Sequence, residues 1–300
     1  MPLTLATKRP PDMKLCRFND NRLGVVEGEI VLDVTPALDA IPPMRYPAPL
    51  GDQFIANFAA VTARVAELKS AAPRLNLKDV KMLSPVGNPT KIVNAPINYV
   101  KHITESNADP GIKHGRANIT HISDWGLFLK ATSSLVGFGS EVKLLYPDRR
   151  NDHELELAVV IGKQGRNIAE ADARKHVVGY ALGLDMTTRG KELLSWRKSA
   201  DTYAVLGPWL TTADEVGDPN VLDLVLKVNG EIRQSANTRD LVYNVDKLIS
   251  WASEKYTLYP GDIILTGTPE GVGPVVPGDL MHCYIQKVGT GEMNVAAQYG

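Results

Sequence analysis

Apolar and polar residues alternate over short stretches along most of this chain. Because successive side chains of a strand point to opposite faces, a period of two predicts strands that are buried on one side. Glycine, proline, asparagine and aspartate separate the stretches, as is typical of turns between strands. The pattern predicts strands at residues 14–18, 22–26, 29–34, 91–93, 127–130, 154–162, 177–185, 221–228, 262–266 and 280–286.

A smaller number of segments show helical spacing of apolar residues. The spacing predicts helices at residues 52–70, 169–176 and 246–256. The pair Asn229 and Gly230 lies between two apolar runs and predicts a two-residue hairpin turn. Many strands with irregularly interspersed helices indicate an α+β fold that is mainly β, and they argue against a doubly wound sheet.

Proline and glycine suggest where the chain divides. Residues 1–12 are polar, contain Pro10 and Pro11, and are expected to form a loose N-terminal extension. Pro85, Gly87 and Pro89 then interrupt the chain after the first predicted helix. We therefore expect a small N-terminal domain over residues 13–88 and a larger catalytic domain over residues 89–300.

Composition narrows the class of protein. Of 300 residues, 44% are hydrophobic and 22% are charged, and the formal net charge is −1. With no basic run, nucleic acid and anionic membrane are not expected partners, and no apolar run approaches the length of a membrane span. Two cysteines favour a reducing compartment over a disulfide framework, and Lys8 and Arg9 follow an apolar stretch, the reverse of a secretory signal. We expect a cytoplasmic, enzyme-sized protein that acts on a small molecule.

Acidic residues at the ends of two predicted strands are the most informative feature. Glu154 and Glu156 share one face at the head of an apolar strand, and Asp185 ends another apolar strand. Buried like charges repel and lose hydration, which a hard cation such as Mg²⁺ would offset. Alternatively, the strand head is exposed and the glutamates are solvated; Asp152 has the same parity and is a further possible ligand.

Basic residues and a histidine–glutamate pair are weaker candidates. His102 and Glu105 lie three apart, so on a helical turn Glu105 can orient the imidazole for taking a proton from water. Lys130 and Lys198 stand beside apolar residues, where either can hold a developing negative charge. The alternatives are an exposed surface pair and lysines that extend from strand edges to water. The polar stretch 101–126 is expected to form a mobile lid.

Taken in order, these fragments resemble the fumarylacetoacetate hydrolase family from about residue 91 to residue 289. The matching segments are Lys91-Ile92-Val93, Asn98-Tyr99, His102-Ile103-Thr104-Glu105, Phe128-Leu129-Lys130, residues 152–162, 185–189 and 198–202, Leu206-Gly207-Pro208-Trp209, Val228-Asn229-Gly230 and residues 260–269. Each motif is weak alone, but the ordered set is specific. The chain departs from the family pattern at Asn94, Ala131, Leu184, Gly190 and Glu192, which border the expected pocket and include no ligand.

The resemblance implies a mixed β-roll catalytic domain, usually dimeric, preceded here by a small α+β domain. It implies that Glu154, Glu156 and Asp185 bind Mg²⁺, Mn²⁺ or Ca²⁺. It also implies a 2-oxo acid substrate, with catalytic and substrate-binding roles for His102, Glu105, Lys198, Lys130, Arg189 and Thr268.

The leading hypothesis is a metal-dependent hydrolase that cleaves a C–C bond in an acylpyruvate-like 2,4-dioxo acid. His102, held by Glu105, would activate water to attack C4, and cleavage would leave a pyruvate enolate stabilised by the metal and Lys198. Arg189 and Thr268 would contact the substrate. The nearest alternative is an isomerase, tautomerase or decarboxylase on the same scaffold, and a more distant one is a ligand-binding module without catalysis.

Overall fold

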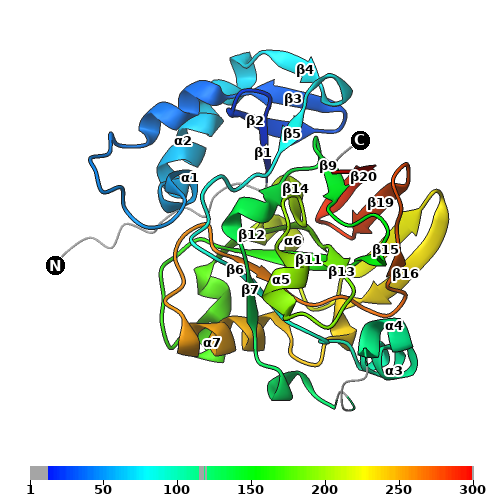
Figure 1. Cartoon of the computed structure of the whole chain (residues 1–300). Coiled ribbons are helices and arrows are strands. Elements are labelled where there is room, and N and C mark those ends of the chain that lie inside the picture. Colours follow the sequence, from blue (N-terminus) through cyan, green and yellow to red (C-terminus); the bar gives the residue numbers. More distant parts are fainter. Residues whose placement is uncertain (1–12, 115–117, 119, 299–300) are drawn as a thin grey trace.

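One large sheet and two smaller sheets organise the chain. In the residues that the computed structural model describes, 13–114, 118 and 120–298, the large sheet has 12 strands (Figure 1). Its main order is β4 (Arg74–Asn76), β3 (Ile30–Asp33), β2 (Arg22–Glu27), β1 (Lys14–Phe18), β14 (Ala204–Thr212), β12 (Val177–Asp185), β11 (Leu155–Ile161), β17 (Ile263–Leu265), β6 (Ile92–Asn94) and β7 (Phe128–Lys130). Off this path, β5 (Met82–Leu83) pairs with β1 and β8 (Leu135–Val136) pairs with β14.

The strands of the two smaller sheets all come after residue 140. A five-stranded sheet has the order β16 (Glu231–Asn237), β15 (Asp223–Val228), β19 (Leu280–Ile285), β20 (Gly289–Ala297) and β9 (Glu141–Leu144). A three-stranded sheet has the order β13 (Thr187–Thr188), β10 (Asn151–His153) and β18 (Gly273–Pro274). This strand-rich architecture confirms the mainly β, α+β prediction.

Helices are short and flank the sheets. They are α1 (Gln53–Ala56), α2 (Phe58–Leu68), α3 (Val100–Ala108), α4 (Pro110–Lys113), α5 (Leu194–Lys198), α6 (Ala213–Val216) and α7 (Val245–Lys255). Short 3₁₀ helices cover Thr35–Ala40, Lys69–Ala71, Leu77–Asp79, Ile122–Asp124, Thr132–Ser134, Glu170–His176 and Thr238–Asp240. Within the described part of the chain, none of these helices has the length and apolar character that a membrane crossing requires.

Two predicted helices differ from those observed. The predicted helix at 52–70 is split, because Asn57 leaves helical geometry and its side-chain amide donates a hydrogen bond to the carbonyl of Gln53 at 2.9 Å. The predicted helix at 169–176 is a 3₁₀ helix in which only Ala173 is buried, so no apolar face favours a regular α-helix. The predicted Asn229–Gly230 turn is confirmed, with φ values of 51° and 84° between the paired strands β15 and β16.

The N-terminal strands extend the large sheet. Lys14 and Leu15 of β1 pair with Thr211 and Leu210 of β14. The large sheet therefore contains strands from both sides of the predicted domain boundary at residue 88. That division therefore describes chain order rather than separate sheets. The expected loose extension, residues 1–12, lies outside the described residues.

Strand β11 lies between two hydrophobic clusters. Leu155, Leu157, Val159 and Ile161 contribute to the larger one, whereas Ala158 and Val160 contribute to the cluster shared with the N-terminal strands and helices. Because of the period of two, Glu154 and Glu156 share the parity of Ala158 and Val160 at the strand head. The fold thus excludes these glutamates from the larger core.

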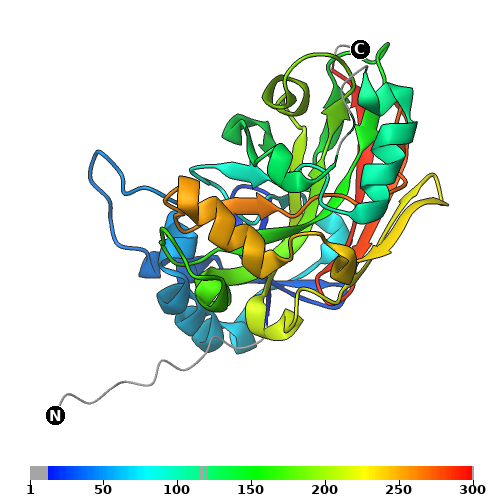
Figure 2. The same cartoon turned by 90° about the horizontal axis from the view of Figure 1, so that it is seen from below.

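The stretch predicted to form a lid, 101–126, contains most of α3, the short α4 and a 3₁₀ turn; residues 115–117 and 119 lie outside the described residues. Figures 1 and 2 show α3 and α4 at the opposite end of the molecule from α1 and α2. His102, Ser106 and Ile122 within this stretch are buried. That the stretch moves stays a prediction.

Gly137 is expected to be essential for stability. A Cβ atom at this position would lie 2.1 Å from the carbonyl carbon of Leu83 and 2.2 Å from the amide nitrogen of Ser84, which are backbone atoms with little freedom to shift. Gly137→Ala should lower the free energy of unfolding by about 3 kcal/mol, measured by urea denaturation. The matched control is Gly273→Ala, whose Cβ would meet its nearest atom at 3.7 Å and should change stability little. Equal urea midpoints for Gly137→Ala and wild type would contradict this packing argument.

Candidate active site

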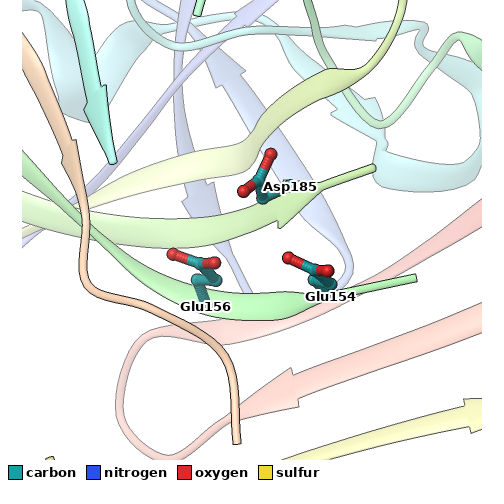
Figure 3. Close-up of side chains that lie close together, drawn as sticks. All are labelled: Glu154, Glu156 and Asp185. Atoms are coloured by element: carbon teal, nitrogen blue, oxygen red, sulfur yellow. The ribbon is translucent and has the colours of Figure 1, made fainter. Parts of the chain in front are cut away.

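Three acidic side chains meet where β11 and β12 lie side by side (Figure 3). Glu154 directly precedes β11, Glu156 belongs to it, and Asp185 ends β12. One carboxylate oxygen from each lies within 4.8 Å of the others, and all three residues are buried. The pairing of Leu155 with Leu184 and a 2.9 Å hydrogen bond from Asp185 N to the Glu154 carbonyl fix the two strand segments.

The surroundings of the two glutamates differ. Burial alone would raise the pKa of Glu154, but Lys198 and Arg189 beside it lower that pKa to about 2. Burial and the nearby Asp185 raise the pKa of Glu156 well above its ordinary value. Among the described residues, the Glu156 carboxylate has one hydrogen-bond donor, the amide of Gly267 at 2.6 Å. Negative charge at Glu156 is therefore the least compensated of the three.

This donor set fits a hard divalent cation. Three buried carboxylates supply the oxygen ligands that Mg²⁺ and Mn²⁺ prefer. Burial and repulsion from Asp185 raise the pKa of Glu156, and a bound cation would offset both effects. No competing histidine or cysteine belongs to the cluster found among the described residues. The three positions are the ones that the sequence singles out as ligands.

Two lysines neutralise part of the cluster. Lys198 Nζ donates to Glu154 Oε2 and Asp185 Oδ2, each at 2.6 Å, and these carboxylates raise its pKa above the ordinary value against the opposing effect of burial. Lys130 Nζ donates to Asp185 Oδ1 and to the carbonyls of Tyr203 at 2.8 Å and Met186 at 3.5 Å. Burial nonetheless lowers the pKa of Lys130. The two lysines differ in position. Lys198 lines the cavity, whereas Lys130 is not among the residues that line it and donates to the three protein acceptors named above.

A chain of ion pairs links the cluster to α4. Arg189 donates to Glu154 Oε1 at 2.9 Å and to Asp152 Oδ2 at 2.8 Å. Arg150 joins the other oxygen of Asp152 to Asp109, the N-cap of α4, with both distances 2.8 Å. Asp152 thus holds two arginines, which explains why it is buried without belonging to the carboxylate triad.

The predicted histidine–glutamate pair is formed. On α3, His102 Nδ1 lies 2.8 Å from Glu105 Oε2, and the other oxygen of Glu105 accepts from Gly271 N at 2.9 Å. Because a carboxylate favours a proton on Nδ1, the lone pair of a neutral imidazole lies on Nε2. Ser106 Oγ lies 3.5 Å from that Nε2. His102 lines the same cavity as the triad.

Thr268 also lines this cavity. Its hydroxyl donates to the carbonyl of Leu155 at 3.0 Å and accepts from Gln234 Nε2 at 2.7 Å. Gln234 is fully buried and also accepts from Leu155 N at 3.0 Å. The network attaches the loop after β17 to the strand that carries the glutamates.

The cavity also contains residues for which the sequence predicts no individual role. Ala95, Pro96 and Ile97 belong to the run 94–98, which departs from the family pattern at the expected border of the pocket, and Ser106, Ile112 and Trp125 belong to the predicted lid stretch. Sequence reasoning missed Leu194 and Arg197. Ser106 could have been found, since it lies one helical turn after His102. Arg197 directly precedes Lys198, but adjacent helical residues normally face different directions, so spacing argued against it. Ile97 has a φ of 52°, a costly conformation for a β-branched residue, which fits a wall shaped for a ligand.

Comparison with known proteins places this chain in a family. Residues 91–296 match the model of the fumarylacetoacetate (FAA) hydrolase C-terminal domain, which is more than half of the chain. The chain belongs to the fumarylacetoacetate hydrolase family, as its ordered motifs predict.

Several relatives are similar over most of their length. Maleylpyruvate hydrolase of Aquipseudomonas alcaligenes is 55% identical over 279 residues, which cover 93% of this chain and 97% of that protein. Human mitochondrial oxaloacetate tautomerase FAHD2A is 41% identical over 236 residues, covering 74% of this chain and 71% of that protein. The crystal structure of maleylpyruvate hydrolase from Sphingobium sp. SYK-6, solved with manganese(II) and pyruvate, has a TM-score of 0.80 and 40% identity, and covers 95% of this chain and 99% of that chain.

Metal binding should stabilise the protein through the triad. Adding Mg²⁺ or Mn²⁺ to chelator-treated protein should raise Tm, by an amount that corresponds to about 2.7 kcal/mol at 100 times the Kd. Glu156→Gln should abolish this rise. In chelator, however, the variant should unfold at or above the wild-type Tm, because a buried carboxylate beside Asp185 is removed. The matched control, Glu292→Gln at an exposed position, should keep the metal response. A full metal-induced rise in Glu156→Gln would refute the ligand assignment.

Proposed function

We propose that this protein hydrolyses maleylpyruvate to maleate and pyruvate, using Mg²⁺ or Mn²⁺ held by Glu154, Glu156 and Asp185. The observation that carries the proposal is a single cavity lined by three buried carboxylates and by a histidine that a glutamate orients. The 55% identity to a maleylpyruvate hydrolase supports the choice of acyl group.

The class of reaction follows from family and similarity. The chain is a metal-dependent hydrolase that acts on a C–C bond of an acylpyruvate, as its sequence predicts. The presence of manganese(II) and pyruvate in the Sphingobium structure supports a divalent metal and a pyruvyl site here. A divalent cation, when bound, supplies Lewis-acid polarisation of the 2-oxo group and counter-charge for its oxygen.

His102 is the proposed general base. Glu105 holds Nδ1, so Nε2 takes a proton from a water molecule as that water attacks the C4 carbonyl. The C3–C4 bond then breaks, its electron pair passes to the pyruvyl fragment as an enolate, and the proton held on Nε2 returns to C3. The products are the free acid of the acyl group and pyruvate, so atoms and charge balance with one water consumed.

Three basic residues and Thr268 have separate proposed roles. Lys198 places its ammonium between Glu154 and Asp185, where it supplies positive charge to the pyruvyl end of the substrate. Thr268 offers a hydroxyl on the cavity wall as a substrate contact. Arg189 orients Glu154 and also lines the cavity. The contacts of Lys130 support a positioning role, in which it holds Asp185, in place of the direct substrate contact predicted from sequence.

Tautomerisation is the second candidate function. Oxaloacetate tautomerase FAHD2A of Homo sapiens and the corresponding tautomerase of Xenopus laevis share about two-fifths of their aligned residues with this chain. Tautomerisation needs proton transfer at C3 and no water attack at C4, so the same residues can serve it. Decarboxylation, like tautomerisation, requires no activated water, so a decarboxylase would differ from the hydrolase in the same way.

We further propose that the protein is a cytoplasmic homodimer. The dimer is inferred from the usual assembly of the family. Both cysteines are buried and unpaired, which supports a reducing compartment. Light scattering of the purified protein would refute the dimer by giving a monomer mass.

Purified protein with Mg²⁺ should convert maleylpyruvate to pyruvate in equimolar amounts. Loss of the enol absorbance follows substrate, and a coupled assay follows pyruvate. A chelator should abolish turnover, and re-added Mg²⁺ or Mn²⁺ should restore it. The double variant Glu154→Gln, Glu156→Gln should be inactive. Turnover that persists in chelator or in the double variant would refute the metal mechanism.

Substitution of His102 tests its assignment as the general base of hydrolysis. His102→Ala should lower kcat for hydrolysis by about 10²- to 10⁴-fold, since a general base contributes that much. Glu105→Gln should keep the fold and lower kcat less, because it weakens the orientation of the imidazole. The control is His176→Gln, outside the cavity, which should retain wild-type kcat. If His102→Ala hydrolyses maleylpyruvate at nearly the wild-type rate, the general-base assignment is wrong.

A further inference from the structure

We propose that Ser106 is a positioning residue that holds the attacking water against His102. The inference rests on the proposed function, because hydrolysis requires a water molecule at this base. Ser106 and His102 both lie on α3 and line the cavity of the carboxylate triad. A spacing of four residues places them on one face of the helix.

The hydroxyl group of Ser106 lies beside the ring nitrogen that carries the lone pair. Ser106 Oγ is 3.5 Å from His102 Nε2, while Glu105 holds the other ring nitrogen, Nδ1, at 2.8 Å. Because 3.5 Å is at the outer limit of a hydrogen bond, the direct contact is weak. A water molecule about 2.8 Å from each of the two atoms can bridge them with stronger hydrogen bonds.

Other buried hydroxyl groups on helices of this protein are satisfied by the backbone. Thr62 in α2 donates to the carbonyl four residues earlier at 2.8 Å, and Ser253 in α7 donates to the carbonyl three residues earlier at 2.7 Å. Ser106 is equally buried, but in the described part of the chain its side chain has one hydrogen-bonding partner, His102 Nε2. A buried hydroxyl with a single long contact retains the capacity to bind a further polar group.

Thr268 is the other residue with a hydroxyl group among the described residues that line the cavity. Its proton is donated to the carbonyl of Leu155 at 3.0 Å, and its oxygen accepts from Gln234 at 2.7 Å. These bonds fix the Thr268 hydroxyl to the strand that carries Glu156. Ser106 therefore offers the hydroxyl proton that remains available next to the base.

Two contacts orient the water where one would let it rotate. The water donates one proton to His102 Nε2 and accepts the hydroxyl proton of Ser106 on one lone pair, so its second lone pair is directed to the C4 carbonyl. His102 then takes the donated proton as the C–O bond forms. Ser106 keeps its own proton throughout, so the balance of the proposed hydrolysis is unchanged.

The test removes the hydroxyl group of Ser106. Ser106→Ala should lower kcat for maleylpyruvate hydrolysis about 10- to 100-fold and change KM less than about 3-fold, because the water is oriented less well while the substrate is bound as before. Ser106→Thr retains a hydroxyl group and should keep kcat within about 5-fold of wild type. Ser106→Cys should resemble Ser106→Ala, since a thiol is a weak donor.

Binding measurements distinguish this role from a structural one. Inhibition by pyruvate and the Mg²⁺-induced rise in Tm should be the same in Ser106→Ala as in wild type, because neither needs the bridging water. The matched control is Thr104→Ala on the same helix. Thr104 is exposed, does not line the cavity, and its hydroxyl contacts the carbonyl of Val100 at 3.5 Å. This control should keep wild-type kcat.

The outcomes separate this inference from the proposed function. Wild-type kcat in Ser106→Ala would overturn the inference, while hydrolysis by the wild type would still support the proposed function. Parallel losses of kcat, pyruvate inhibition and the metal response would also overturn it, because they would show a structural role. Failure of the wild type to hydrolyse maleylpyruvate with Mg²⁺ or Mn²⁺ would overturn both proposals.

Two further results would count against the inference. A maleyl adduct on Ser106, detected by mass spectrometry of a rapidly quenched reaction, would show that the serine attacks C4 itself. If Ser106→Ala does not fold, Ser106→Cys and Ser106→Thr decide, and equal kcat values for these two variants would contradict a role for the hydroxyl group.

Discussion

Mutual repulsion of three buried carboxylates is the constraint around which the site is built. The pairing of β11 with β12 brings Glu154, Glu156 and Asp185 within 4.8 Å of one another in a region from which water is largely excluded. Such a cluster is unfavourable unless cations compensate it. Lys198 and Arg189 compensate part of the charge, whereas burial and the nearby Asp185 raise the pKa of Glu156. This electrostatic arrangement suits a divalent cation.

Ion pairs connect the carboxylate cluster to neighbouring segments of the chain. Arg189 connects Glu154 to Asp152, and Arg150 connects Asp152 to Asp109 at the start of α4. The segment that carries His102 is therefore attached to the carboxylate cluster by ion pairs in addition to the bond between Glu105 and Gly271. Packing and charge together place the proposed base on the same cavity as the proposed ligands. The N-terminal strands pack in one hydrophobic cluster with Ala158 and Val160 of β11, the strand that carries Glu156.

The functional assignment combines two independent lines of reasoning. Family membership and similar proteins indicate the reaction class. The cavity and its contacts indicate which basic residues can reach a substrate and which hold other side chains in place. Lys130, for which the family resemblance implies a substrate contact, donates hydrogen bonds to Asp185 and two carbonyls, which supports the positioning role proposed for it. Arg197, which sequence reasoning passed over, lines the cavity with its guanidinium held by carbonyls.

The sequence by itself determined the strand-rich class, most strand positions, the hairpin at Asn229 and the grouping of the three acidic residues, because these depend on local periodicity and on ordered motifs. It could not reveal the break at Asn57, where a side-chain hydrogen bond competes with the helix, or the continuation of the sheet from β1 into β14. It singled out Lys198 and Arg189, which line the cavity, but it could not tell that Arg197 lines the cavity as well. Those features depend on contacts between residues far apart in the chain, and only the tertiary structure decides which donors meet which acceptors.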